Sequence, residues 1–240
     1  MAVAAVLVAV SLVIWLGLRP STRQPAPADS RSASPTVPSW DEQQPSGTPP
    51  PIVAPDGGTL IDCPRHDTSP HNLYPKDGWL HGGGLKVKEI PGWKHEWVPM
   101  GWVFDMSAQT DLVRSSRSTR WFSMLGVGAL HVADGFESPH VSAFQVMSCF
   151  ATSRFYSGYV GRSDLLSEAV TVNGHPGWRL RSEVRVNMPE FPDVKGDWIN
   201  VIVVDTGSPE SLGVLIASVT IDDHARADLM EQALESLTTR

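Results

Sequence analysis

The second half of the chain carries a succession of short apolar segments separated by turn signals. Trp178 to Val186 alternates apolar and charged residues, which is typical of a half-buried strand. Trp198 to Val204 and Leu212 to Ile221 are denser apolar runs rich in β-branched residues, and they predict the central strands of a sheet. Another strand is expected over Ser167 to Val172, because Asn173-Gly174 follows it as a turn signal.

Two stretches change to the period of a helix. In Asp222 to Leu237 the expected buried stripe is Ala225, Leu229, Ala233 and Leu237, with Met230 and Leu234 beside it. Ser138-Pro139 predicts the start of another helix, with Ser138 as its cap. The expected stripe of that helix is Val141, Phe144, Met147 or Ser148, Ala151 and Phe155.

The first half of the domain predicts further strands. Leu85 to Ile90 alternates strictly, so it should have one buried side, and Pro91-Gly92-Trp93 should turn the chain. Trp121 to His131 is apolar, and Gly126 and Gly128 within it would permit close approach of another element. Strands bracketed by helices favour an α+β fold, with an antiparallel sheet sandwiched with helices, over a doubly wound parallel sheet.

The first residues predict a single membrane anchor. Ala2 to Leu18 is free of charge and would span roughly 26 Å as a helix, just enough for a bilayer core of about 30 Å. A cleaved signal peptide is the alternative, although the basic start of such peptides is missing. We therefore divide the chain into an anchor at 1–19, a proline-rich disordered linker at 20–58 and a globular domain at 59–240.

The side of the membrane on which the domain lies follows from opposing signals. Arg19, Arg23 and Arg31 follow the span, and the positive-inside rule would leave the domain in the cytoplasm. The long linker and the two cysteines favour the extracytoplasmic side. Cys63 and Cys149 are expected to form a disulfide there, and the alternative is two buried free thiols. The bond would connect the predicted helix that begins at Ser138-Pro139 to the start of the domain.

Metal and cofactor chemistry finds little support in the spacing of the polar residues. The most metal-like neighbourhood lacks a second closely spaced ligand pair, so no metal and no cofactor are expected; its members are Asp62, Cys63, His66, Asp67, His71 and His81. His95-Glu96 begins like a zincin helix, but Pro99 occupies the position of the second histidine. Gly82 to Gly84 lacks the Lys-Ser/Thr of a phosphate loop and should be a hinge.

Hydrolytic chemistry and nucleic-acid binding are not expected either. Neither Gly161-Arg162-Ser163 nor Gly207-Ser208-Pro209 completes the motif around a serine nucleophile, so the chain is not expected to be an enzyme. The formal net charge of −7 argues against a nucleic-acid partner.

Tryptophans are unusually dense between Trp79 and Trp121. Trp93, Trp97 and Trp102 lie in an irregular segment with proline and glycine, and we take them as the candidate binding surface for a protein, a lipid or a glycan. The alternative is that they pack into the core.

Three segments resemble the PsbP-like and LpqN-like domains of membrane-tethered or secreted actinobacterial proteins. They are the Leu85 to Trp93 strand ending in Pro-Gly-Trp, the Val170 to Val186 hairpin with Val-Asn-Gly-His-Pro-Gly-Trp, and the strand pair and final helix of Trp198 to Leu237. The resemblance implies a non-catalytic, extracytoplasmic accessory module of the cell envelope, and the apolar run predicts that Ala2 to Leu18 anchors it in the cell membrane. A hydrolase acting on an envelope component is the rival hypothesis. The cysteine pair and the Trp97 to Trp102 segment depart from the family pattern.

Overall fold

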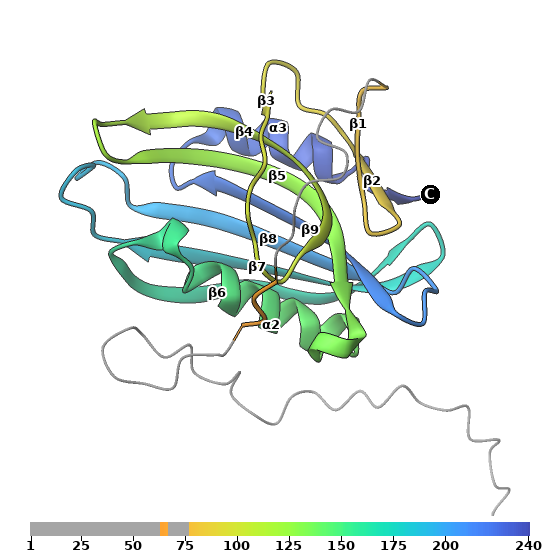
Figure 1. Cartoon of the computed structure of the whole chain (residues 1–240). Coiled ribbons are helices and arrows are strands. Elements are labelled where there is room, and N and C mark those ends of the chain that lie inside the picture. The colour runs from red at the N-terminus through yellow and green to blue at the C-terminus, as the bar shows by residue number, and fades with distance from the viewer. Residues whose placement is uncertain (1–62, 67–76) are drawn as a thin grey trace, which may run out of the picture. The chain divides into compact units, whose positions relative to one another are not determined.

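The computed structural model describes residues 63–66 and 77–240. Its main sheet has seven antiparallel strands in the order β3-β4-β5-β9-β8-β7-β6 (Figure 1). The strands are β3 (Lys94–His95), β4 (Phe104–Ser115), β5 (Arg120–His131), β6 (Tyr159–Val172), β7 (His175–Val186), β8 (Gly196–Val204) and β9 (Ser211–Thr220). A small antiparallel sheet consists of β1 (Trp79–Gly82), β2 (Leu85–Lys88) and β10 (Thr238–Thr239). The predicted α+β class with an antiparallel sheet is confirmed.

Two α-helices cover opposite faces of the main sheet. Helix α2 (Pro139–Ala151) packs on β7 and β8, and helix α3 (His224–Leu234) packs on β9 and β2 on the other side (Figure 1). We call these sides the α2 face and the α3 face. Each face has its own apolar cluster, and the small sheet belongs to the cluster of the α3 face.

Strands β8 and β9 are central because both of their faces are covered. Val203 is fully buried in the cluster of the α2 face, and its neighbour Val204 is fully buried in the cluster of the α3 face. Burial of such a side chain contributes roughly 1.5–3 kcal/mol. The dense apolar pattern of these two segments therefore predicted their position in the sheet correctly.

Strand β9 lies between β5 and β8 and joins two parts of the sheet. It pairs with β5 from Met124 to His131 and with β8 from Asp197 to Val204. On one side of it lie β3, β4 and β5, and on the other side lie β8, β7 and β6.

The glycines of β5 allow neighbouring chain segments to pack closely against this strand, as predicted. A Cβ atom at Gly128 would lie 2.4 Å from Val103 Cγ1, and one at Gly83 would lie 1.9 Å from the carbonyl oxygen of Gly128. Gly83 also has a φ of +57°, which favours glycine. The glycine run thus forms the tight turn from β1 to β2, pressed against β5.

The two helices are rotated relative to the predicted stripes. In α3 the buried residues are Met230, Ala233 and Leu234, while Leu229 is 40% exposed. In α2 the predicted Val141 is 51% exposed, and the buried side starts instead at Ser142 and Ala143. In α2 small side chains such as Ser142 and Ala143 lie on the buried side, where the tight packing excludes larger ones, whereas in α3 the buried side is shifted toward Met230 and Leu234.

Four strands were missed by the sequence pattern, namely β1, β4 and the two-residue strands β3 and β10. The irregular segment that contains Trp97 and Trp102 ends where β4 begins, at Phe104. The buried face of β4 contains polar residues, which hid its alternation; Gln109 is 2% exposed and accepts a 2.8 Å hydrogen bond from the backbone N–H of Ile90. The strand β1 was missed because Leu80 is the one large apolar residue on its buried side, where Gly82 is the other.

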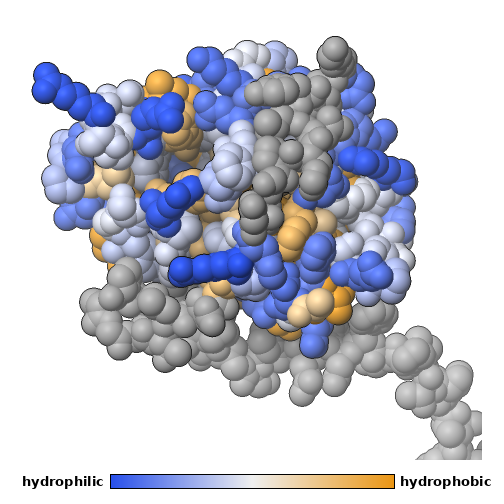
Figure 2. All heavy atoms as spheres, viewed as in Figure 1, coloured by the Kyte–Doolittle hydropathy of each residue, from blue (hydrophilic) through white to orange (hydrophobic). Residues whose placement is uncertain are grey.

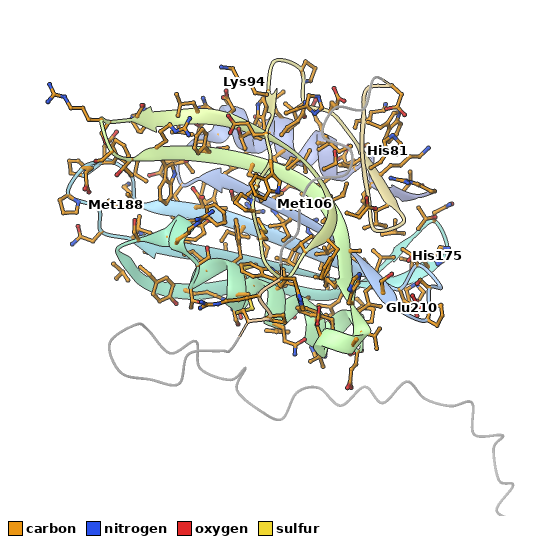
Figure 3. All side chains as sticks on the ribbon, viewed as in Figure 1. His81, Lys94, Met106, His175, Met188 and Glu210 are labelled. Atoms are coloured by element: carbon orange, nitrogen blue, oxygen red, sulfur yellow. A yellow bond between two sulfur atoms is a disulfide. The ribbon has the colours of Figure 1, made fainter. Side chains whose placement is uncertain are left out.

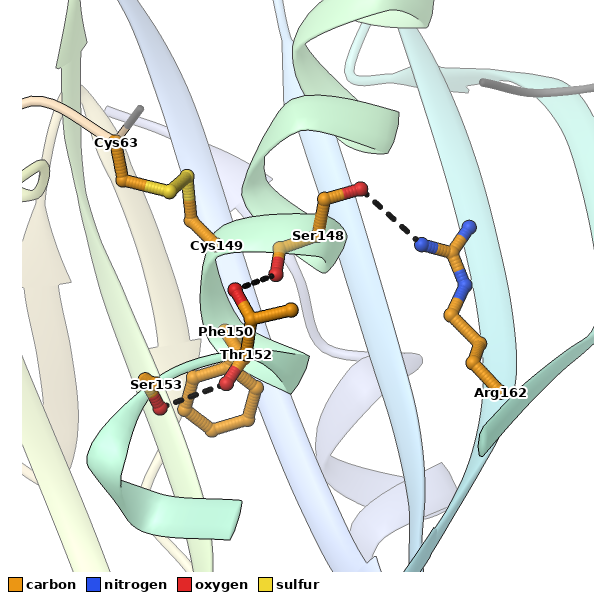
Figure 4. Close-up of a disulfide and its surroundings, with 7 residues drawn as sticks. All are labelled: Cys63, Ser148, Cys149, Phe150, Thr152, Ser153 and Arg162. Carbon is orange, nitrogen blue, oxygen red and sulfur yellow. Dashed lines mark hydrogen bonds between the residues drawn. A yellow bond between two sulfur atoms is a disulfide. The ribbon is translucent and has the colours of Figure 1, made fainter. Parts of the chain in front are cut away.

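The disulfide joins Cys63 to Cys149 across a sequence separation of 86 residues, as predicted (Figure 4). It connects the segment 63–66 to α2. Two further bonds hold this segment: the backbone N–H of His66 donates to the carbonyl of Gly101 (2.9 Å), and its imidazole pairs with Asp134 (3.0 Å).

The predicted anchor and linker lie outside the described residues, as do the domain boundaries at residues 19 and 58. Within residues 63–66 and 77–240, no helix is long and apolar enough to cross a membrane.

Candidate functional site

A cavity of about 320 Å³ opens on the α2 face, at the end of the sheet where β7 turns into β8. Met188, labelled at this end in Figure 3, is one of its lining residues, while His175 and Glu210 lie at the opposite end. Three segments form the walls: residues 96–99, residues 119–124 at the start of β5, and residues 150–157, which contain the 3₁₀ helix η2 (Arg154–Tyr156). The floor comes from the central strands, through Asp197 of β8 and Ser218 of β9.

The wall at residues 150–157 is positioned by the end of α2. The Ser153 hydroxyl donates to the carbonyl of Phe150 (2.7 Å) and accepts a bond from the backbone N–H of Phe155 (3.3 Å). Figure 4 shows the first of these bonds below the disulfide. The second bond caps η2, which puts Phe155 on the wall and Tyr156 at the floor.

Most of the lining is aromatic or aliphatic. Tyr156 makes edge contacts with Trp121 at 5.7 Å and with Phe150 at 5.4 Å between ring centroids. Val98 and Met188 add aliphatic surface. Cavities of this size and lining are typical of sites for small, largely apolar molecules.

A buried carboxylate lies at the floor. Asp197 is 2% exposed and accepts hydrogen bonds from the Tyr156 hydroxyl (2.8 Å) and the Trp121 indole N–H (3.2 Å). Ser218 and Thr220 also bond to it, and the Trp121 N–H is shared with the Thr220 hydroxyl at 3.0 Å. Four donors therefore surround two carboxylate oxygens.

Burial dominates the acid–base properties of this network. It raises the pKa of Asp197 to about 7, although the bonds from Tyr156, Trp121, Thr220 and Ser218 lower that pKa. Burial, and then the charge of Asp197, raise the pKa of Tyr156 well above its usual value of 10. The tyrosine is therefore neutral at physiological pH, and its hydroxyl is occupied as a donor to the carboxylate.

The rim of the cavity carries two arginines. The Arg120 guanidinium lies over the ring of Phe122 (5.2 Å), and that of Arg154 lies over the ring of Phe155 (5.8 Å). Both arginines are exposed. The one acidic residue of the lining other than Asp197 is Glu96, which accepts a 2.9 Å bond from the Thr110 hydroxyl.

The structure does not bring the three predicted tryptophans together. Trp97 is 47% exposed and lines the cavity. Trp93 is 8% exposed in the cluster of the α3 face, and Trp102 is 8% exposed in the cluster of the α2 face. Trp93 and Trp102 thus pack into the core, which was the alternative interpretation, and the three tryptophans do not form one surface.

The described residues of the metal-like neighbourhood are each engaged elsewhere. Cys63 is in the disulfide, His66 pairs with Asp134, and His81 bonds to Asp77 at 2.8 Å. Asp62, Asp67 and His71 lie outside the described residues. Among residues 63–66 and 77–240, no three histidine, cysteine or acidic side chains converge as a metal site would require.

The rejected catalytic motifs lie in ordinary structural elements. His95 ends the two-residue strand β3, so the zincin helix is not formed. Gly161 to Ser163 lie within β6, and Gly207 to Pro209 lie in the turn between β8 and β9.

Asp197, Tyr156 and the rim arginines were missed by the sequence reasoning. One signal was present for Asp197: it stands with period 2 before Ile199, Val201 and Val203, so it had to face the same buried side. Tyr156 follows the predicted helix, in a segment whose conformation the pattern did not define.

Comparison with known proteins gives structural neighbours only. No known protein family matches the sequence, and no curated protein matches it. The cyanobacterial PsbP protein (CyanoP) from Synechocystis sp. PCC 6803 is similar at 12% identity and a TM-score of 0.38, over 65% of this chain and 87% of that one. A protein of unknown function from Pseudomonas aeruginosa, PA94, described as a putative regulator, is similar at 13% identity and a TM-score of 0.38, over 66% of this chain and 99% of that one.

Proposed function

We propose that this protein is a non-catalytic binding module of the cell envelope whose cavity on the α2 face holds a small, largely apolar molecule. The observation that carries the proposal is the cavity of about 320 Å³ with aromatic walls. In this proposal Ala2 to Leu18 anchors the chain in the cell membrane, and a PsbP-like or LpqN-like domain at 59–240 lies on the extracytoplasmic side.

The polar groups of the cavity support binding rather than catalysis. A hydrolase needs a nucleophile, an orienting base and donors aimed at a developing oxyanion. Asp197 has the pKa of a possible base, but its oxygens accept bonds from Tyr156 and Trp121. Those donors are directed at a carboxylate of the protein itself, so they serve to hold the two aromatic rings in place.

A photoreactive probe tests the cavity directly. The full chain in lipid nanodiscs is labelled with a neutral alkylphenyl diazirine, and the labelled peptides are mapped by mass spectrometry. We expect labelling of peptides that contain residues 96–99 and 150–157. Ser157→Trp fills the cavity from its wall and should abolish this labelling, whereas the control Ser163→Trp, at an exposed serine of β6, should leave it unchanged.

Uniform labelling of the surface, or equal labelling of both variants, would contradict the proposal. The proposed location has a separate test. Protease applied to intact, wall-stripped cells should release the domain, and protection until lysis would place the domain inside the cell.

A further inference from the structure

The tip of the β4–β5 hairpin concentrates positive charge in an acidic protein. Arg114, Arg117 and Arg120 lie at this tip, and the sequence has no aspartate or glutamate from residue 112 to residue 133. The whole chain has a formal net charge of −7, so the tip is electrostatically distinct from the rest. Arg114 pairs with Asp193 at 2.6 Å. Within the described residues, no carboxylate pairs with Arg117, and the same holds for Arg120 and Arg154 at the rim.

Large apolar side chains are exposed beside these charges. Trp97 is 47% exposed and Leu112 is 48% exposed. Leu112 lies directly opposite Phe122 in the β4–β5 ladder, which puts both on the same face of the sheet. Figure 2 shows hydrophobic side chains exposed between long hydrophilic ones on the face of the molecule seen there. We define the mouth surface as Trp97, Leu112, Phe122 and Phe155 together with Arg117, Arg120 and Arg154.

This combination matches the interface of a membrane. Tryptophan prefers the headgroup region, where its ring is half in apolar surroundings, and arginines near an anionic leaflet are attracted to the lipid phosphates. Leu112 and the aromatic rings below Arg120 and Arg154 would enter the boundary between headgroups and acyl chains.

We propose that the mouth surface docks on a bilayer that contains anionic lipid, with the cavity opening toward the headgroups. This contact is separate from the predicted anchor, and it goes beyond ligand binding in the cavity because it does not require the cavity to be filled. It gives the domain a fixed orientation on the membrane surface.

A second basic and aromatic patch provides a matched control. On the small sheet, Lys86 Nζ and Lys88 Nζ lie 4.9 Å and 5.8 Å from the ring of Trp79. This patch has two positive charges and a tryptophan. Of the large hydrophobic side chains that are exposed, none lies on β1 or β2 among the described residues.

The experiment uses the full chain in nanodiscs of phosphatidylcholine alone and of phosphatidylcholine mixed with phosphatidylglycerol, so that the anchor is equally inserted in both. Hydrogen–deuterium exchange is measured on peptides covering residues 115–119, residues 152–157 and the control strands β1 and β2. We expect slower exchange at 115–119 and 152–157 when phosphatidylglycerol is present, and loss of that protection at high salt.

Arg117→Gln, Arg120→Gln and Arg154→Gln combined should weaken the docking on the order of 100-fold, at about fivefold per arginine, and remove the protection. Trp97→Ser should reduce it while leaving the charge intact. Lys86→Gln with Lys88→Gln should change nothing. The proposal is overturned if protection is equal in the two lipid mixtures, if it appears on β1 and β2, or if the lysine variant abolishes it. Filling of the cavity is read from diazirine labelling and docking from the lipid dependence of hydrogen exchange, so failure of one proposal is distinguishable from failure of the other.

Discussion

The two faces of the sheet are covered in different ways. On the α3 face the helix lies on a closed apolar cluster and is held at its edges by ion pairs. Arg226 contacts Asp111 at 2.7 Å, and Arg179 contacts Glu231 at 3.1 Å. On the α2 face the helix is held by a disulfide, and beyond its end a cavity and a buried carboxylate remain.

The difference separates stability from function. On the α3 face the closed apolar cluster supplies most of the stabilisation. Ion pairs that are partly exposed, like the two at its edges, contribute little each. The α2 face includes a buried carboxylate and a cavity whose apolar lining lacks close packing partners, both of which lower stability. Features that cost stability are expected where a protein does its work, so the α2 face is the side on which we place function.

The largest expected effect tests how the α2 face is fastened. Replacing both Cys63 and Cys149 by serine should lower the free energy of unfolding by about 4–5 kcal/mol, because the bond closes a loop of 86 residues in the unfolded chain. Urea unfolding of the full chain measures this. A loss below about 1 kcal/mol would show that α2 is held by packing alone.

The buried carboxylate should produce a pH dependence of nearly the same size. The unfolded chain ionises this carboxyl near 3.8 and the folded protein near about 7, so the folded state binds more protons between these values. Stability should therefore fall as pH rises through this window and level off above it, by about 4 kcal/mol in total. Asp197→Asn should remove this component, and the difference between the two proteins, measured by urea unfolding at several pH values, isolates it. Parallel pH profiles would contradict the assignment.

On the α3 face the prediction concerns the rotation of the helix. Met230 is 2% exposed, and Met230→Ala should cost about 3 kcal/mol through the cavity that it leaves. Leu229, one position earlier and 40% exposed, is the matched control and should cost less than about 0.5 kcal/mol on the same substitution. Neither variant should alter diazirine labelling of the cavity. Equal losses of stability would mean that the helix is rotated toward the stripe expected from the sequence.

The smallest effect on stability is expected at the exposed tryptophan of the rim. Trp97→Ala should change the free energy of unfolding by less than about 1 kcal/mol, because nearly half of the side chain is exposed. It should nevertheless reduce diazirine labelling of residues 150–157, across the cavity from it. Trp97→Phe keeps an aromatic wall and should preserve most of that labelling. A large loss of stability in Trp97→Ala would place this residue in the core with Trp93 and Trp102.

Much of the fold could be predicted from the sequence because buried positions in strands and helices are apolar at regular intervals. The segments that became β8 and β9 are apolar at almost every position, which predicted that both sides are covered. This pattern is weaker where buried residues are polar or small. Gln109 is buried and polar, and β4 was missed; Ala143 is buried and small, and the buried side of α2 was predicted at the wrong positions.

The cavity could not be predicted in the same way. It depends on three segments distant in sequence and on the exact end of α2, which hydrogen bonds of Ser153 define. Trp97 is exposed, and the residues that line the cavity with it include Phe122 and Phe155 rather than Trp93 and Trp102. Periodicity locates residues relative to a layer, and it does not say which loops meet above that layer.

The position of β9 between β5 and β8 also determines when the domain can assemble. The hairpins β4–β5 and β6–β7–β8 can each form from neighbouring segments, but the ladders that unite them run through Ser211–Thr220, near the end of the chain. During synthesis or export the two half-sheets therefore cannot pair, and their apolar surfaces remain exposed, until β9 is available. Both partners of the disulfide appear earlier, at residues 63 and 149. Oxidation can thus link the first half to α2 before β9 arrives, which would shorten the search that completes the sheet.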